Sequence, residues 1–215
     1  MSAASPDDRR DHERQHEGRY HHGDLPAALV DAAIEVIAQR GVRGFSVAEA
    51  SRRVGVSAAA PYRHFSDRED LLAAVAIRGL RAFAAMVAAE AGDAPVAEQR
   101  LCGMARAYVR FAGEQRALFD TIFSAGIDKS RYPELERAWE PIDAFLAVVR
   151  ELCDGDGEAA GALAEAIEAT AHGHAMLLID GQYGGGPGAL AIAADRAAAA
   201  VRAIIAGRGA LLGPR

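Results

Sequence analysis

The side chains best suited to chemistry stand in one short run, Tyr62-Arg63-His64. A phenol, a guanidinium and an imidazole can all donate hydrogen bonds to phosphate oxygens, contacts that hold a protein on nucleic acid without reading its sequence. Arg63 is also the best candidate for the edge of a base, because a guanidinium binds guanine through two hydrogen bonds. Arg68 adds a further candidate phosphate contact. These residues predict binding to double-stranded DNA.

Other chemistry is disfavoured by the same test. No Ser/His/Asp or Cys/His arrangement has a catalytic context, so we expect no enzyme activity and no cofactor. Asp154-Gly155-Asp156-Gly157 lacks the further oxygen ligands of a calcium loop, and the glycine run 184–188 follows a helix without a phosphate-binding Gly-Lys-Ser/Thr. We interpret the first as a turn and the second as a linker.

Histidines gather near the N-terminus, at positions 12, 16, 21 and 22. Without acidic or cysteine partners at ligand spacing they fit a solvated tail better than a metal site, so no metal is expected. Residues 1–18 are polar and without periodicity, which predicts a disordered arm. Its end, Arg19 and Tyr20, leads into the first helix and could reach phosphates or the minor groove; a solvated terminus is the alternative.

Two short helices around a turn must position the DNA-binding run. Ser46 followed by Glu49 has the spacing of a capping box, which predicts a helix that opens at Val47. Gly55 supplies a tight turn, and Ser57 can cap a second helix. This order is typical of a helix-turn-helix.

The second helix is expected to be short, because Pro61 lies near the limit of its first turn. The alanines before Pro61 allow close approach to the major groove and methyl contacts to thymine, while Phe65 is expected in the core. The predicted DNA-binding residues are Arg19, Tyr20, Ser46, Ser57, Ala58, Ala59, Tyr62, Arg63, His64 and Arg68.

Residues 45–72 resemble the DNA-binding domain of the TetR (tetracycline-repressor) family of transcriptional regulators. The resemblance includes the amphipathic segment 25–41, which ends in glycine, and the Tyr-x-His-Phe spacing. It covers roughly the first third of the chain. Ala60-Pro61-Tyr62-Arg63-His64-Phe65 is similar to a subgroup with that sequence. Departures are Ala50-Ser51, where the family commonly has Ile-Ala or Val-Ala, and Arg68, where lysine is usual.

Charge distribution agrees with a DNA-binding end. Residues 40–68 contain six arginines and only two acidic residues, Glu49 and Asp67, so this stretch has a net charge of +4. The whole chain has a net charge of −6, and the rest of the chain therefore has −10. A basic face on an acidic protein favours phosphates over non-specific adhesion. No secretory signal and no apolar run of about 20 residues is apparent, so a soluble cytoplasmic protein without membrane partners is expected. Cys102 and Cys153 are expected to be reduced and buried.

After Leu72 the pattern is helical throughout, which makes the fold class all-α. Breaks predict helices over about 67–90, 95–111, 114–124, 133–153, 158–182 and 189–205, with a kink at Pro141. The expected domains are the arm (1–18), a three-helix helix-turn-helix DNA-binding domain (19–66) and a helical ligand-binding and dimerisation domain (67–215). The last assignment is implied by the family resemblance.

Aromatic and methionine side chains in this remainder could line a ligand cavity with a few polar handles. The more common role of such side chains is core, with His172 a hydrogen-bonded core histidine. The candidate ligand-binding residues are Met104, Tyr108, Phe111, Phe119, Phe123, Trp139, Phe145, His172 and Met176.

A homodimer is expected, because one short reading helix makes too few contacts and two-fold symmetry matches a pseudo-palindromic site. The candidate interface could instead be internal core; it comprises Ala164, Ile167, Ala171, Ala175 and Leu178, then Leu190, Ala194, Ala197, Val201, Ile204 and Ile205. The predicted function is a ligand-responsive regulator, most simply a repressor released by an unknown small apolar effector. The alternative is a helical small-molecule-binding or scaffold protein that recognises no specific operator.

Overall fold

The computed structural model describes residues 24–211, and within that range the regular elements are helices. They are α1 (Leu25–Arg40), α2 (Val47–Val54), the 3-10 turn η2 (Pro61–Arg63), α3 (Arg68–Ala91), α4 (Ala97–Glu114), α5 (Arg116–Ser124), the 3-10 turn η3 (Lys129–Arg131), α6 (Pro133–Ala138), α7 (Glu140–Leu152), α8 (Gly157–Ile179), α9 (Ala189–Ala206) and α10 (Arg208–Leu211). The all-α fold class is confirmed.

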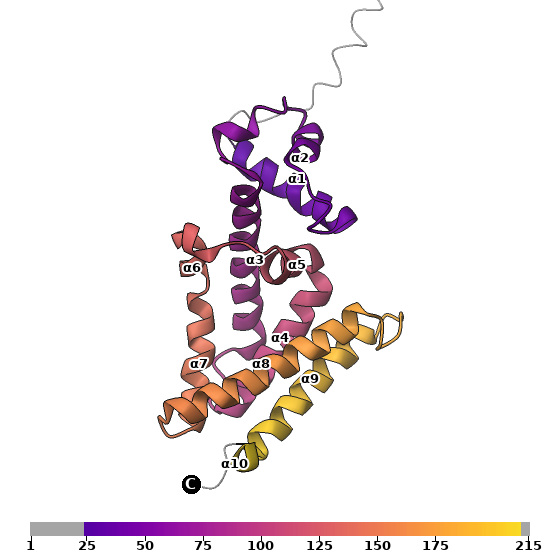
Figure 1. Ribbon diagram of the computed structural model, residues 1–215. Helices are drawn as coiled ribbons and strands as arrows, with labels where there is room; N and C mark the ends of the chain where they lie inside the picture. The colour runs from indigo at the N-terminus through magenta and orange to yellow at the C-terminus, as the bar shows by residue number, and fades with distance from the viewer. Residues whose placement is uncertain (1–23, 212–215) are drawn as a thin grey trace, which may run out of the picture.

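The helices form a small N-terminal unit joined to a larger helical body (Figure 1). α1, α2 and η2 lie at one end, and α3 runs from that end deep into the body. α4 is the central helix of the body and packs against α3, α7, α8 and α9, while α8 and α9 pack side by side at the far end. One continuous apolar core extends from α1 to α9.

Side-chain caps mark the starts of four helices, α1, α2, α3 and α8. Ser46 Oγ accepts a hydrogen bond from the backbone N–H of Glu49 at 3.2 Å, so α2 opens at Val47 as predicted. Asp24, Asp67 and Asp156 accept in the same way at the starts of α1, α3 and α8. The 154–157 sequence is therefore a turn that also begins a helix.

The end of α2 requires glycine. Gly55 has a φ of 78°, in the left-handed region, and its N–H bonds to the carbonyl of Arg52 while the N–H of Val56 bonds to that of Ser51. These two bonds form a Schellman motif, which satisfies carbonyls that the helix leaves without partners. The predicted tight turn is thus confirmed in detail.

The body departs from the sequence expectations at three places. The predicted helix over 133–153 is two helices, because α6 ends at Ala138 and α7 begins at Glu140 with Pro141 as its second residue. A proline is tolerated in that first turn, so it marks a new start where we expected a kink. η3 and α10 were not predicted.

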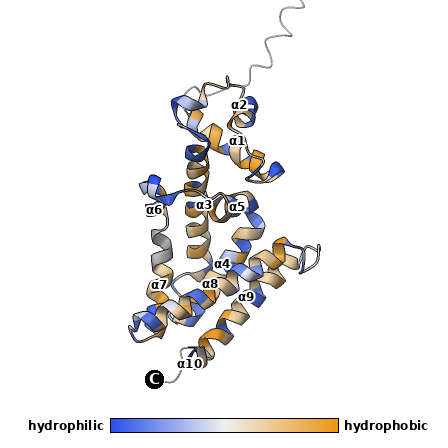
Figure 2. Cartoon of the chain, in the orientation of Figure 1, coloured by the Kyte–Doolittle hydropathy of each residue, from blue (hydrophilic) through white to orange (hydrophobic). Residues whose placement is uncertain are grey.

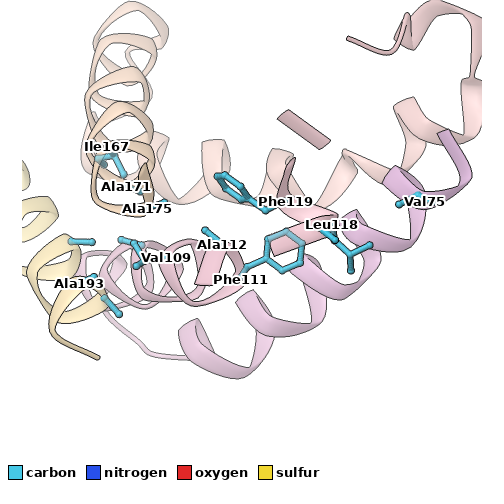
Figure 3. Close-up of a cluster of buried hydrophobic side chains, with 14 of the residues drawn as sticks. Val75, Val109, Phe111, Ala112, Leu118, Phe119, Ile167, Ala171, Ala175 and Ala193 are labelled. Atoms are coloured by element: carbon cyan, nitrogen blue, oxygen red, sulfur yellow. The ribbon is translucent and has the colours of Figure 1, made fainter. Parts of the chain in front are cut away.

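The core of the body gathers small and aromatic side chains from α3, α4, α5, α8 and α9 (Figure 3). Phe111 and Phe119 are almost completely buried there. α4 crosses the end of α3 at Gly103, where an added Cβ would lie 2.6 Å from the carbonyl oxygen of Glu90. Glycine is therefore needed for this close approach.

α3 corrects one expectation about apolar runs. It has 24 residues and a stretch hydropathic enough to span a bilayer by length and composition alone. In the structure it packs against α1, α4, α5 and α6, and its mostly hydrophobic length lies among neighbouring helices (Figure 2). Four helices of the same chain therefore cover part of its surface.

Both cysteines are buried, as predicted. Cys102 lies between α4 and α9, with its Sγ 3.4 Å from the backbone oxygen of Ala198. Burial raises the pKa of the Cys102 thiol, which keeps it protonated and unreactive near neutral pH.

Candidate functional site

Six of the ten predicted DNA-binding residues lie on the segment 57–64, which we call the DNA-reading segment after its predicted role: Ser57, Ala58, Ala59, Tyr62, Arg63 and His64. This segment is not the α-helix expected from the sequence. It forms a turn followed by η2. Pro61 has no N–H to donate to a helical hydrogen bond. The segment instead forms hydrogen bonds between residues three apart, from the Ala60 N–H to the Ser57 carbonyl at 3.0 Å and from the His64 N–H to the Pro61 carbonyl at 2.9 Å. No capping bond from the Ser57 side chain occurs among the described residues.

The polar run of this segment faces outward. Tyr62 is 57% exposed, and Arg63 and His64 are exposed beside it. Among residues 24–211 none forms an ion pair with Arg63 or His64. Pro61 and Phe65 are buried beneath them, and Phe65 belongs to the core as predicted. The three polar side chains are thus held outward and are free to meet a ligand.

The remaining predicted DNA contacts are distributed unevenly. Ser46, Ser57, Ala58 and Ala59 are exposed at the same end of the molecule, although Ser46 Oγ also serves as the α2 cap. Arg19 and Tyr20, like the arm and its histidines, lie outside the described residues. Arg43, on the exposed turn between α1 and α2, was not among the predicted contacts.

Arg68 has a structural role that the sequence did not indicate. Its Nε donates to the carbonyl oxygen of Phe45 at 3.2 Å and its Nη2 to that of Val42 at 2.6 Å. The guanidinium also lies 5.5 Å from the centre of the Phe45 ring. Arg68 therefore ties the start of α3 to the α1–α2 connection, and its phosphate contact stays a prediction.

Other arginines of the basic stretch hold α2 in place. Arg53 Nη1 donates to Glu35 of α1 at 3.2 Å, and Arg52 Nη2 donates to Glu49 at 2.7 Å. The hydrogen bond from Arg52, with the charges of Arg40 and Arg53, lowers the pKa of Glu49. Part of the +4 charge is thus neutralised within the N-terminal unit.

A second polar cluster joins the body to the start of α3. It is formed by residues 128–132, which we call the strap. The N–H of Asp128 donates to Glu69 at 3.0 Å, Arg131 donates to Glu69 at 2.9 Å and to Asp67 at 3.2 Å, and the Tyr132 hydroxyl donates to Asp70 at 2.9 Å. The strap thereby holds the first turn of α3, immediately after the DNA-reading segment.

The carboxylates of this cluster are stabilised in their charged form. The Ser66 hydroxyl and N–H lower the pKa of Asp70, and the N–H of Asp70 followed by Arg131 lowers the pKa of Asp67. Hydrogen bonds to an ionised carboxylate favour ionisation. At neutral pH the strap therefore contacts Asp67 and Asp70 in their ionised form.

The body contains a cavity of about 100 Å³ among α3, α4, α5, α7 and α8, which we call the aromatic cavity. Its wall is mostly aromatic and aliphatic, and Glu168 is its one charged lining residue. The lining residues are Phe83, Val87, Met104, Ala105, Tyr108, Phe123, Trp139, Phe145, Ile167, Glu168 and Ala171.

Only some of the predicted ligand-binding residues line this cavity. Met104, Tyr108, Phe123, Trp139 and Phe145 do. Phe111 and Phe119 are core, and Met176 is 36% exposed on the surface of α8. His172 does not line the cavity, but its Nδ1 is 2.9 Å from the hydroxyl of Tyr108, a hydrogen bond that orients a lining side chain. Burial raises the pKa of Tyr108, so its hydroxyl stays protonated.

The predicted dimer residues lie inside the protomer. All are buried or half-buried in the protomer, on the faces of α8 and α9 that pack against each other and against α4: Ala164, Ile167, Ala171, Ala175, Leu178, Leu190, Ala194, Ala197, Val201, Ile204 and Ile205. Ile167 and Ala171 also line the aromatic cavity. The sequence pattern correctly predicted which faces of α8 and α9 are buried, but they are buried by helices of the same chain and not by a partner subunit.

Comparison with known families gives two matches that together cover more than half of the chain. Residues 29–75 match the family described as bacterial regulatory proteins, tetR family. Residues 101–204 match the tetracyclin repressor-like C-terminal domain. The first match runs from α1 into α3 and contains the whole DNA-reading segment.

Individual relatives agree. An uncharacterized HTH-type transcriptional regulator of Bacillus subtilis (strain 168), YobS, is 30% identical over 101 residues, which are 47% of this chain and 52% of that one. The chain thus spans about half the length of this curated relative.

Solved structures extend the similarity to nearly the whole chain. A protein of unknown function from Rhodococcus sp. RHA1 is 30% identical with a TM-score of 0.68, covering 88% of this chain and 97% of that one. A TetR family transcriptional regulator from Thermus thermophilus, PfmR, shares the fold at 16% identity and a TM-score of 0.61, covering 81% of this chain and 97% of that one. With both family domains matched in order, this chain belongs to the TetR family of bacterial regulatory proteins.

Proposed function

We propose that the protein binds operator DNA as a homodimer and represses transcription until a small apolar effector enters the aromatic cavity. It acts in the cytoplasm and is neither an enzyme nor a membrane protein. The observation that carries the proposal is the outward run Tyr62-Arg63-His64, unpaired within the described residues and seated on buried Pro61 and Phe65. An exposed guanidinium, phenol and imidazole on a rigid base suit phosphates and a base edge.

The effector half of the proposal rests on the aromatic cavity. Its wall is largely apolar, with Tyr108 and Glu168 as polar groups, a composition typical of small-molecule sites. The wall includes Phe83 and Val87 of α3, the helix whose first turn follows the DNA-reading segment. An occupant that shifts α3 would therefore change the position of that segment. Such an effector must bind one position of α3 more tightly than the other.

The dimer is best built from the outward faces of α8 and α9. Apolar side chains remain exposed there, among them Leu177 at 45% and Ile192 at 46%. Small residues at helical spacing, including Ala169 and Gly173 on α8 and Ala199 on α9, are exposed between them. Two such hairpins can pack as an isologous four-helix bundle, which pairs two reading segments for a pseudo-palindromic site.

The direct test is selection of bound duplexes from random DNA by the full-length protein, followed by titration of the selected duplex. We expect a recurring pseudo-palindrome whose affinity falls steeply with salt. The triple variant Tyr62→Phe, Arg63→Ala, His64→Ala should weaken binding and flatten the salt slope by about one unit for each lost contact between a cationic side chain and a phosphate. Arg81→Ala, an exposed arginine on α3 away from the reading segment, is the matched control.

The alternative is a helical ligand-binding or scaffold protein without operator specificity. It would be favoured by equal affinity for selected and scrambled duplexes at physiological salt, or by a triple variant that binds as well as the Arg81→Ala control. Either result would remove the DNA-reading role while leaving the cavity intact.

A further inference from the structure

A second cavity, of about 260 Å³, lies between α3, α5, α6 and the segment that joins α5 to α6. Ala76 of α3, Ile122 of α5 and Leu135 of α6 form its apolar wall. Phe123 and Trp139 line both this cavity and the aromatic cavity, and their ring centres are 6.1 Å apart. The two spaces are therefore neighbours on either side of these two side chains.

Lys129 is the charged side chain that lines the second cavity. It is exposed and places its Nζ 3.8 Å from the centre of the Trp139 ring. Among the side chains that the structure describes, no carboxylate forms an ion pair with it. The lining residues include no acceptor side chain.

A single cation beside an apolar wall specifies the ligand that suits it. An ammonium gains most from an anionic acceptor. A carboxylate provides that acceptor, while an amine would be repelled by Lys129. A hydrocarbon or aryl group attached to the carboxylate would remove the apolar wall from water.

We propose that the second cavity binds a small apolar carboxylate, whose oxygens accept hydrogen bonds from Lys129 Nζ while its apolar part packs against Ala76, Ile122 and Leu135. The aromatic cavity is a poor site for this ligand, because its one charged lining residue is Glu168. Binding at the second cavity does not depend on the proposed DNA-binding function.

The location gives the site a connection to α3. Lys129 belongs to the strap, and its neighbours Asp128 and Arg131 hold Glu69 and Asp67 in the first turn of α3. A carboxylate that draws Lys129 away from the Trp139 ring acts on the same short segment. The site is thus placed to report its occupancy at the DNA-reading end.

The test is a fluorescence titration of the full-length protein, because Trp139 is the one tryptophan of the chain. The probes are phenylacetate, its neutral counterpart phenylacetamide and the cation 2-phenylethylamine. We expect saturable binding of phenylacetate with a Kd about tenfold below that of phenylacetamide, and no saturable response to the amine. Calorimetry at the same concentrations checks the stoichiometry.

Variants assign the binding to this site. Lys129→Gln should raise the Kd for phenylacetate to that for phenylacetamide, Lys129→Arg should keep the preference, and Arg137→Gln on the exposed face of α6 should change neither. Circular dichroism and thermal unfolding confirm that each variant is folded.

Two results would overturn the proposal. One is equal affinity for acid and amide in the unmodified protein. The other is a preference for the acid that survives Lys129→Gln but strengthens in Glu168→Gln, which would move the ligand to the aromatic cavity.

Discussion

Gly55 carries a left-handed backbone that ends α2 and aims the chain toward the DNA-reading segment. An added Cβ would touch nothing within 4 Å, so the only cost of a side chain there is backbone conformation. Gly55→Ala should therefore lower the free energy of unfolding by about 1–2 kcal/mol. Urea denaturation followed by circular dichroism measures the change.

Gly161 is the matched control, because it lies inside α8 with equally open space around it. Gly161→Ala should raise stability by about 0.5–1 kcal/mol, since alanine loses less backbone freedom than glycine in a helix. Equal effects of the two substitutions would show that φ at position 55 is not the constraint.

At the same scale, the sequence predicted the Ser46 cap and the turn glycine, because each depends on neighbours a few residues away, whereas the predicted Ser57 cap does not form. It failed at Pro61, whose missing N–H was recognised but whose effect is the loss of the α-helix from the segment. It also missed the carbonyl contacts of Arg68, because Phe45 and Val42 lie more than 20 residues away along the chain.

The strap and the first turn of α3 give the molecule an acid-sensitive joint. The Ser66 hydroxyl lowers the pKa of Asp70, the N–H of Asp70 lowers that of Asp67, and the Ser130 hydroxyl lowers that of Asp128. A lowered pKa stabilises the folded state above the ordinary carboxyl pKa of about 4, and this stabilisation is lost as pH falls through the lowered values.

We therefore expect the midpoint of urea unfolding to change little from these groups between pH 7 and pH 5 and to fall below about pH 4. Asp70→Asn should lower the midpoint at pH 7 and reduce the fall in acid. Asp93→Asn, at an exposed turn outside the strap, serves as the control. Parallel pH profiles for the unmodified protein and Asp70→Asn would show that Asp70 does not contribute to the loss of stability in acid.

The bounds of the helices were predicted more accurately than the contacts between them. Periodicity and caps placed α1, α2, α3 and α5 within about two residues, since those signals are local. The cavity was predicted only in part: Met104 and Tyr108 line it while Phe111, on the same helix, is core. An apolar helix face predicts burial, but whether core or cavity covers it depends on helices that are distant in sequence.

At the scale of the whole molecule, the proposed function requires a homodimer, so the oligomeric state is the property to test. Ala199→Arg places a long charged side chain on the outward face of α9 and should convert a dimer to monomers, because an unpaired charge in an apolar interface is strongly unfavourable. Light scattering after size exclusion measures the mass. Ala85→Arg, on an exposed part of α3, should leave the mass unchanged. An unmodified protein that stays monomeric at every concentration would contradict the dimer.

The length of α3 sets how strongly a small rearrangement in the body is felt at the other end. At 1.5 Å per residue its 24 residues span about 36 Å, so a tilt of about 5° about the buried end displaces the first turn by about 3 Å. Hydrogen bonds tolerate errors of only a few tenths of an ångström. We therefore expect α3 to act as a lever arm: a movement too small to disturb the packing around Gly103 would displace Arg63 from the DNA contact proposed for it.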